Sequence, residues 1–367
     1  MSRDILAEEQ LKFEIIRVLS RYFLRQIEDL VRTKTGAFFP VEKIENIELG
    51  RRLGKRRELQ LATLTVRDAI SDRKFSFELA FKFHADQDAA IKEGNGALWL
   101  GDVLKNNFKV HTPQLLYLSR ESSLLIYEGV QAKEFYDSEL GEHEKLLLAG
   151  MALPYVHGIF KQRVQVDRYL HLISGVTAGL RMSPDEKTEF NSLFKPFLRH
   201  IGISEAGGNC FGDFHPGNIM FQHGGDINAS TSNTGNVVVD HTHIFLIDPA
   251  FLDNEGNVDR TEDIGTFFSK IASNEWLLNQ SFDTSIGQIE QFVKGYNYIT
   301  QMNGTTLQDY YVDGKPSFDF QIGLGILLDT LYKMKTPGGD FGTKTSTNIE
   351  AAKQILTRQP FEAVEPA

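Results

Sequence analysis

The segment Gly-Asp-Phe-His-Pro-Gly-Asn, from Gly212 to Asn218, constrains this chain more than any other part of its sequence. It places the carboxylate of Asp213 five residues before the carboxamide of Asn218. A second carboxylate, Asp248, directly follows the apolar run Ile244–Ile247, which is typical of a buried strand. We therefore expect a loop and a strand end to bring these three polar side chains into one site.

These three side chains suit the transfer of a phosphoryl group from a nucleoside triphosphate to an alcohol. Such a transfer needs Mg²⁺ to neutralise the triphosphate, and a carboxylate to orient the attacking hydroxyl and accept its proton. Mg²⁺ prefers hard oxygen ligands and usually takes one or two carboxylates besides phosphates and water. We expect Asp213 to face the hydroxyl, and Asn218 and Asp248 to hold the metal.

With the later segment Glu262–Gly265, these motifs resemble the aminoglycoside phosphotransferase and choline kinase-like branch of the protein-kinase-like superfamily. That branch carries His-Gly-Asp-x-His-x-x-Asn, an Ile-Asp-Phe/Trp segment and a downstream Asp-Leu/Ile-Gly/Ala. The resemblance spans roughly residues 44–270 and implies that Asp263 anchors the backbone of the catalytic loop from a helix. Two positions depart from it: Phe211 stands where the family has His, and Pro249 replaces an aromatic residue.

The resemblance implies an α+β, protein-kinase-like two-lobed fold, with a small antiparallel-sheet N-lobe and a mainly helical C-lobe. The corresponding division is an N-terminal helical extension at residues 1–35, an N-lobe at 36–130 and a C-lobe at 131–367. The helical extension could form a dimer contact, so a homodimer is one expectation; packing on the small lobe is the favoured interpretation.

The family's phosphate-positioning lysine corresponds to Lys82, which lies in an apolar strand pattern where a lysine is unusual. The alternative is an outward-facing strand residue. Glu93, in a helix expected from Asp86 to Leu104, would pair with Lys82, with Asp88 and Glu78 as competing partners. The Gly-Asn-Gly stretch at 94–96 would weaken that helix.

Backbone groups are expected to contact the nucleotide at two further places. Gly50 and Gly54 lie in a predicted turn between strands, where N–H groups could approach phosphate. The segment Ile126–Val130, including Glu128, corresponds to the interlobe hinge, whose backbone would read the adenine edge. Three strands are expected at residues 44–49, 58–66 and 75–83.

Helices are expected to form most of the C-lobe and to supply the acceptor site. The sequence Ser183-Pro184-Asp185-Glu186 has the pattern of a capping box with proline in the first turn, so a helix should begin there and run to about Ile201. His157 is interpreted as a packed helix residue rather than a catalyst. The other helices are expected at 141–180, 275–300 and 318–335.

Composition excludes several classes of protein. A net charge of −10 argues against a nucleic-acid binder, which would carry a basic surface. The single Cys210 excludes an intramolecular disulfide and a multi-cysteine metal site, and we expect it to be buried. No apolar run approaches the ~20 residues that a membrane span needs, so we expect no membrane contact and a cytoplasmic location. The 27 phenylalanines predict an aromatic-rich core.

The sequence thus predicts an ATP- and Mg²⁺-dependent phosphotransferase that moves the γ-phosphoryl group to a hydroxyl of a small molecule. One alternative is a catalytically impaired, kinase-like nucleotide-binding module, which the departures at Phe211 and Pro249 motivate. A protein kinase is less favoured because no Ala-Pro-Glu segment follows Asp248. His241 and His243 share a strand face, so a transition-metal site competes there with plain surface histidines.

Overall fold

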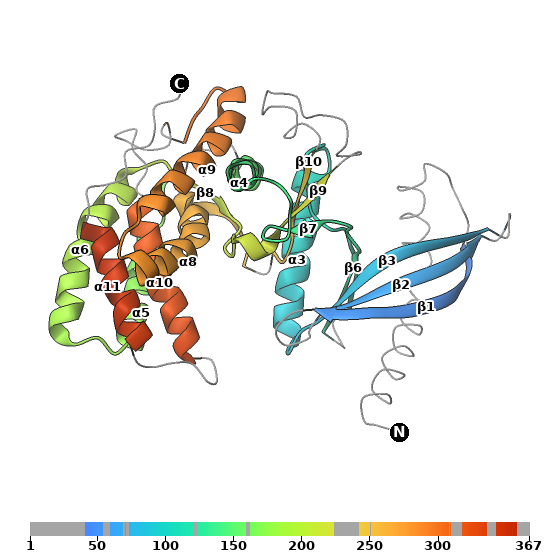
Figure 1. Ribbon diagram of the computed structural model, residues 1–367, viewed down its shortest axis with the longest axis horizontal. Coiled ribbons are helices and arrows are strands. Elements are labelled where there is room, and N and C mark those ends of the chain that lie inside the picture. The colour runs from blue at the N-terminus through green and yellow to red at the C-terminus, as the bar shows by residue number, and fades with distance from the viewer. Residues whose placement is uncertain are drawn as a thin grey trace. The chain divides into compact units, whose positions relative to one another are not determined.

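The computed structural model describes the chain in segments, and these fall into two compact units (Figure 1). One unit comprises Met1–Asp102 and Thr112–Gln131, and the other comprises Val103–His111 and Ala132–Ala367. The predicted N-terminal helix, Gly54 and His241 lie outside the described residues. The described residues are 41–53, 59–68, 70, 73–119, 123–158, 162–223, 242–249, 251–307, 309, 318–335 and 343–357.

The first unit is built on a five-stranded antiparallel sheet with the strand order β1-β2-β3-β6-β5. Alternation along β3 buries Phe77, Leu79 and Phe81 on one face of this sheet. Lys82 therefore belongs to the opposite face. The strands are β1 (Val41–Leu53), β2 (Leu59–Asp68), β3 (Lys74–Phe83), β5 (Leu115–Ser119) and β6 (Leu124–Glu128).

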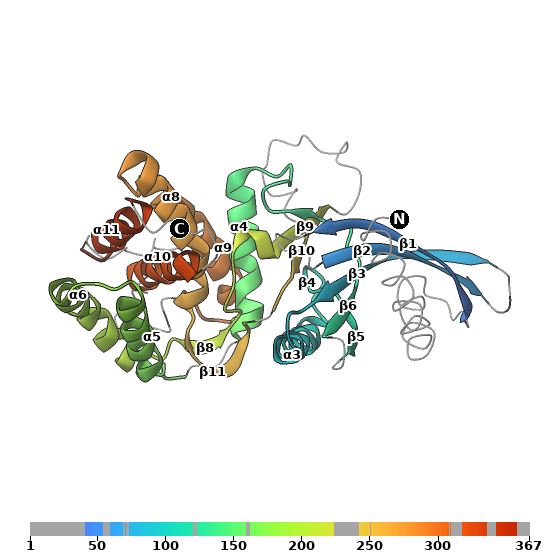
Figure 2. The ribbon, with the colours of Figure 1, turned by 90° about the horizontal axis from the view of Figure 1, so that it is seen from below.

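Helix α3 (Gln87–Leu104) lies beside β5 and β6 (Figure 2). The helix continues through the Gly-Asn-Gly stretch that should weaken it, because the position of Gly94 has a packing role. A Cβ at Gly94 would lie 3.0 Å from Leu118 and 3.3 Å from Leu125, so the glycine lets α3 approach the sheet closely. Tertiary contact therefore outweighs the poor helix propensity of glycine here.

The predicted turn at Gly50 is wrong, because β1 continues to Leu53. The pairing with β2 shifts between Leu49 and Arg52, where β1 advances by one residue more than its partner strand. This bulge accommodates Gly50 inside the strand. The Gly50 carbonyl accepts a hydrogen bond from the buried Gln60 side chain at 2.9 Å.

The second unit is mainly helical, with two small sheets. Strands β4, β10, β9 and β7 form one sheet in that order, and β11 pairs with β8. The strands are β4 (Val110–His111), β7 (Lys133–Glu134), β8 (Gly207–Cys210), β9 (Ile219–His223), β10 (Thr242–Leu246) and β11 (Asp253–Asp259). The helices are α4 (Glu142–His157), α5 (Val166–Gly179), α6 (Pro184–Ile203), α8 (Thr261–Asn279), α9 (Asp283–Met302), α10 (Phe318–Lys335) and α11 (Thr343–Thr357). The predicted α+β class is confirmed.

Two predicted helices are each replaced by a pair of helices. The expected helix at 141–180 is α4 and α5, and α4 ends at His157, before Gly158 with its φ of 71°. The expected helix at 275–300 spans the end of α8 and most of α9, with a break at Gln280, whose φ is 52°. The capping box at Ser183 is confirmed, because its side chain accepts from Glu186 N and Glu186 reaches back to Ser183 N.

Aromatic rings form the centre of the second unit, as the phenylalanine content predicts. Phe267 contacts Phe214, Phe268 and Phe292 with ring centroids 5.0 to 5.7 Å apart. Phe211 also contacts Phe214 edge to face. These rings belong to α8, α9 and the segment after β8. The loop that carries the Gly-Asp-Phe-His motif therefore packs into the aromatic core through Phe211 and Phe214.

Helices α4 and α9 cross at two glycines that face each other's backbone. A Cβ at Gly150 would overlap the Phe292 carbonyl, and a Cβ at Gly295 would overlap the Leu147 carbonyl. We expect Gly150→Ala to lower the free energy of unfolding by about 1–3 kcal/mol in urea denaturation, because the helices must separate. The matched change Gly287→Ala, in open space on α9, should instead raise it by about 0.5–1 kcal/mol. Equal effects at both sites would contradict the close crossing.

Candidate active site

A strand pairing brings Asn218 next to the strand end that carries Asp248. Asn218 immediately precedes β9, and Ile219 pairs with Leu246 in the antiparallel β9–β10 ladder. Beyond that pair, Ile247 N donates to the Asn218 carbonyl at 3.0 Å. Asp248 is the next residue, and its φ of 60° is left-handed, which a non-glycine residue rarely adopts.

Asn218 also forms hydrogen bonds with Asp213, so this one residue contacts both the loop and the end of β10. The Asn218 Nδ2 group donates to the Asp213 carbonyl at 2.9 Å and lies 3.4 Å from Asp213 Oδ2. Both partners are acceptors, which identifies the amide nitrogen and directs Oδ1 away from them. An amide oxygen and the carboxylate of Asp248, which comes one residue beyond the Ile247–Asn218 hydrogen bond, are ligand types that fit Mg²⁺.

The ring of His215 is oriented within the loop. Its Nδ1 accepts from Gly217 N at 3.0 Å, so the proton of the neutral ring is on Nε2, which lies 3.5 Å from Asp213 Oδ2. Partial burial raises the pKa of Asp213, but His215, Lys270 and Asn218 together hold that pKa below its ordinary value. Asp213 is therefore ionised at neutral pH, with a side chain that is 35% exposed.

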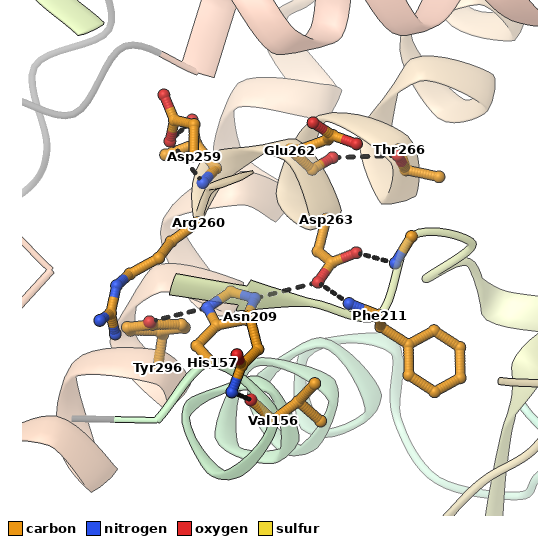
Figure 3. A network of polar contacts seen from close by, with 12 residues as sticks. Val156, His157, Asn209, Phe211, Asp259, Arg260, Glu262, Asp263, Thr266 and Tyr296 are labelled. Carbon is orange, nitrogen blue, oxygen red and sulfur yellow. Dashed lines mark hydrogen bonds and ion pairs between the residues drawn. The ribbon is translucent and has the colours of Figure 1, made fainter. Parts of the chain in front are cut away.

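The backbone of this loop is held by Asp263 of α8, as the sequence predicts. Asp263 is fully buried, and its carboxylate accepts from Phe211 N at 2.7 Å and from Gly212 N at 2.8 Å (Figure 3). Gly212 has a φ of 84°, and a Cβ there would overlap the Phe251 carbonyl, so only glycine fits. Phe211 N still donates to Asp263, so the departure from His does not release the loop backbone.

His157 is a third donor to Asp263 that sequence reasoning placed only as a packed residue. Its Nε2 lies 3.0 Å from Asp263 Oδ2, and its Nδ1 lies 2.9 Å from the Tyr296 hydroxyl (Figure 3). Tyr296 comes from α9 and His157 ends α4, so the pair ties three helices to the loop. Val156-His157 resembles a Leu-His position of the family, but that resemblance did not indicate Asp263 as the partner of this histidine.

The buried imidazole should make stability depend on pH. Complete burial lowers the pKa of His157 below 6.5, although Asp263 acts to raise it. Below pH 6.5 the unfolded chain takes up a proton that the folded protein resists, so the free energy of unfolding falls as pH falls. We expect this slope to approach 1.4 kcal/mol per pH unit, roughly the value for one proton. Urea denaturation from about pH 5 to 7 should show a smaller slope in His157→Gln; an unchanged slope would contradict the assignment.

Arg260 is a residue that the sequence did not indicate. It is fully buried, and its guanidinium donates to the Gly158 carbonyl at 2.6 Å and to the Gly207 carbonyl at 3.2 Å. These bonds join the end of α4 to β8, the strand that leads into the loop. The carbonyl groups that accept from Arg260 come from distant parts of the chain, so its role appears only in the folded structure. In the sequence, Arg260 is only one of several charged residues near the start of a helix.

In the first unit, Lys82 pairs with Glu93, as predicted. Lys82 Nζ lies 2.8 Å from Glu93 Oε2, and the lysine side chain is only 15% exposed, so the outward-facing alternative is wrong. The competing partner Glu78 is exposed. Glu93 also lies 2.8 Å from His84 Nε2 and accepts from the Tyr127 hydroxyl at 2.7 Å, which the sequence did not indicate.

The segment expected to read a base has part of its backbone already engaged. Glu128 N donates to the Gln114 carbonyl at 2.9 Å, and Gly129 N donates to the Glu78 carbonyl at 2.7 Å. A Cβ at Gly129 would lie 2.5 Å from Glu78, so the two segments can approach this closely only because residue 129 is glycine. Base recognition therefore stays a prediction, for the Glu128 carbonyl and the Val130 backbone.

The remaining expectations concern single residues. Cys210 is buried, and burial raises the pKa of its thiol, so its packing role is confirmed. His243 Nδ1 lies 2.9 Å from His111 Nε2 on the paired strands β10 and β4.

Within the described segments, no three His, Cys, Asp or Glu side chains gather in a way that could hold a metal ion. The described helices include none with the length and apolarity to cross a bilayer.

The sheet-bearing first unit, the helical second unit and the anchored Asp213–Asn218 loop define the protein-kinase-like fold. An ethanolamine kinase from Plasmodium vivax is similar over 96% of this chain and 94% of its own, at 15% identity and a TM-score of 0.51. A choline/ethanolamine kinase family protein from Mesorhizobium loti matches at 14% identity over 84% and 88% of the chains, with a TM-score of 0.48. A choline kinase from Streptococcus pneumoniae matches at 11% identity over 90% and 98%, with a TM-score of 0.46.

The similarity is structural only. No protein-family model matches the sequence, and no curated protein does. At 15% identity, the Plasmodium vivax structure confirms the predicted protein-kinase-like fold and leaves the reaction to be argued from the site.

Proposed function

We propose that this protein is an ATP- and Mg²⁺-dependent phosphotransferase that moves the γ-phosphoryl group to a hydroxyl of a small molecule. The observation that carries the proposal is the Asp213–Asn218 hydrogen bond on a loop anchored by Asp263, with Asp248 one residue beyond the Ile247–Asn218 bond. Two carboxylates and an amide in this arrangement match the needs of phosphoryl transfer.

Asp213 would act on the acceptor. Its pKa lies below the ordinary value, so it is a weak base towards an intact alcohol. We infer that it mainly orients the hydroxyl and takes the proton as the new P–O bond forms. The Nε2–H of His215, 3.5 Å from the carboxylate, would help to keep Asp213 ionised and turned in one direction.

Asn218 and Asp248 would hold Mg²⁺, whose charge offsets that of the triphosphate when it is bound. In the first unit, Lys82 would hold the phosphates, with its ammonium group fixed by Glu93. The Glu128 carbonyl and the Val130 backbone would contact the base. Gly50, which lies in β1, and Gly54 keep a proposed role near phosphate only through their backbone N–H groups.

The acceptor is proposed to be a small molecule, and the site of action the cytoplasm. The similar Plasmodium vivax protein is an ethanolamine kinase, and ethanolamine carries one primary hydroxyl. This makes small amino alcohols the first acceptors to try, ahead of sugars and aminoglycosides. The binding-module alternative is not favoured, because Asp213, Asn218 and Asp248 are all retained and Asp263 holds the loop backbone despite Phe211.

The proposal predicts two results with purified protein. Mg-ATP should raise the melting temperature, and EDTA should abolish the shift. ADP release should then appear with at least one member of a panel of amino alcohols, sugars and aminoglycosides, and should need Mg²⁺. A melting-temperature shift without turnover on any alcohol would favour the nucleotide-binding module, and transfer of labelled phosphate to casein alone would favour a protein kinase.

A further inference from the structure

The Glu93 carboxylate is held by side chains from two neighbouring strands of the sheet. Lys82 of β3 and His84, just after β3, both lie 2.8 Å from Glu93 Oε2. The Tyr127 hydroxyl of β6 donates to Oε1 at 2.7 Å. Glu93 is 1% exposed, so these groups replace the water that a charged carboxylate requires. The Lys82–Glu93 pair therefore belongs to a four-residue cluster: Lys82, His84, Glu93 and Tyr127.

The charge state of the cluster follows from its contacts. Burial raises the pKa of Glu93, but hydrogen bonds and charges from His84, Lys82 and Tyr127 outweigh burial and lower it. His84 Nε2 contacts Glu93 Oε2 at 2.8 Å, without the alignment of a regular hydrogen bond. His84 is fixed on its other side, because its backbone N donates to the Ser123 carbonyl at 2.9 Å.

Tyr127 joins two parts of the first unit that have different proposed roles. Its ring packs with Ala97 of α3 and with Leu125 of β6. The next residues along β6 and beyond it are Glu128–Val130, the segment proposed to contact the base. One hydrogen bond from Tyr127 thus connects that segment to the carboxylate that positions Lys82.

We propose that Tyr127 and His84 are positioning residues that hold the Glu93 carboxylate against Lys82, and that Tyr127 couples the base-contacting segment to the phosphate-binding lysine. This inference rests on the proposed function, because it requires that the first unit bind a nucleotide. Neither residue would touch substrate. Each would act through Glu93, and its loss would loosen the ammonium group of Lys82.

The test for Tyr127 compares ligands with and without phosphate. The Kd values of ATP with Mg²⁺, of ADP and of adenosine are measured by isothermal titration for the wild type and for Tyr127→Phe. We expect Tyr127→Phe to weaken ATP and ADP by roughly tenfold, the low end for a hydrogen bond to a charged group, and to leave adenosine unchanged. The exposed Tyr332→Phe is the matched control and should change nothing.

His84 gives a second test that uses rescue by a similar donor. His84→Ala removes the side chain that contacts Glu93 Oε2 and should weaken ATP and ADP but not adenosine. His84→Gln places an amide N–H at a similar reach and should recover most of the lost affinity. His143→Ala, at an exposed position on α4, is the control. Melting temperatures without ligand show that each variant is folded.

The outcomes separate this inference from the function on which it rests. A wild type that binds no Mg-ATP overturns the proposed function and this inference with it. A wild type that binds Mg-ATP, beside a Tyr127→Phe variant of equal affinity, overturns the inference alone. Equal losses for ATP and adenosine in Tyr127→Phe also overturn it, because they would show general damage to the sheet rather than a loosened Lys82.

Discussion

Asp213→Ala should lower the rate of phosphoryl transfer by about 10²–10⁴-fold, the usual contribution of a positioned acid or base. Nucleotide affinity should stay close to that of the wild type, because Asp213 is proposed to act on the acceptor hydroxyl and not on the triphosphate. The measurement pairs single-turnover phosphoryl transfer with the Kd of Mg-ATP for the same preparation. The replaced side chain is 35% exposed, so the variant should fold.

Two further variants show whether the effect is specific to Asp213. Asp185→Ala, at an exposed position in the first turn of α6, should leave both the rate and the affinity unchanged. Asn218→Ala should instead weaken Mg-ATP binding and slow transfer together, because Asn218 is proposed to hold the metal. Undiminished transfer in Asp213→Ala would remove the proposed mechanism.

Asp263→Ala should lower the free energy of unfolding by about 3–5 kcal/mol, the usual cost of removing one partner of a buried charge network. Asp263 is fully buried, and its loss strands the N–H groups of Phe211 and Gly212 and the imidazole of His157. Phosphoryl transfer should fall with it, because these N–H groups set the path of the loop that carries Asp213. Urea denaturation and single-turnover transfer measure the two effects.

The matched change for Asp263 is Asp137→Ala, which removes an aspartate at an exposed position between β7 and α4. It should change the free energy of unfolding by less than about 0.5 kcal/mol. A loss below about 1 kcal/mol in Asp263→Ala would mean that water or another donor replaces the carboxylate, and that the loop is not held as described.

Much of the fold could be predicted because its signals are local. The capping box at Ser183 and the strand expected at residues 75–83 depend on neighbouring residues, and both are confirmed. The predictions are wrong where contact with a distant segment of the chain determines the local structure. Gly50 reads as a turn from its neighbours, but pairing with β2 keeps it in a strand. Gly94 should weaken a helix, but contact with Leu118 and Leu125 favours it there.

The residues of the candidate site likewise fall into those that the sequence identified and those that it did not. Asp213 and Asn218 were identifiable because a catalytic loop packs its functional groups into a few consecutive residues. The pairing of Lys82 with Glu93 was predicted from the resemblance and is confirmed. His84, Tyr127 and Arg260 gave no signal, because histidine, tyrosine and arginine occur widely and acquire a role only through a partner that is far away in sequence. The interpretation of His157 as a packed helix residue is confirmed, but its partner Asp263 was not predicted.

The sequence alone determined which reactive groups are present: a carboxylate and an amide in one compact motif, a second carboxylate after a later apolar run, a lysine in an apolar strand, and a single cysteine, too few for an intramolecular disulfide. Tertiary structure alone decided which buried groups hold that chemistry in place. His157, Phe211 and Gly212 converge on Asp263, and His84 and Tyr127 converge on Glu93. A buried carboxylate must be satisfied by whatever donors folding brings to it, and these donors come from separate elements of each unit.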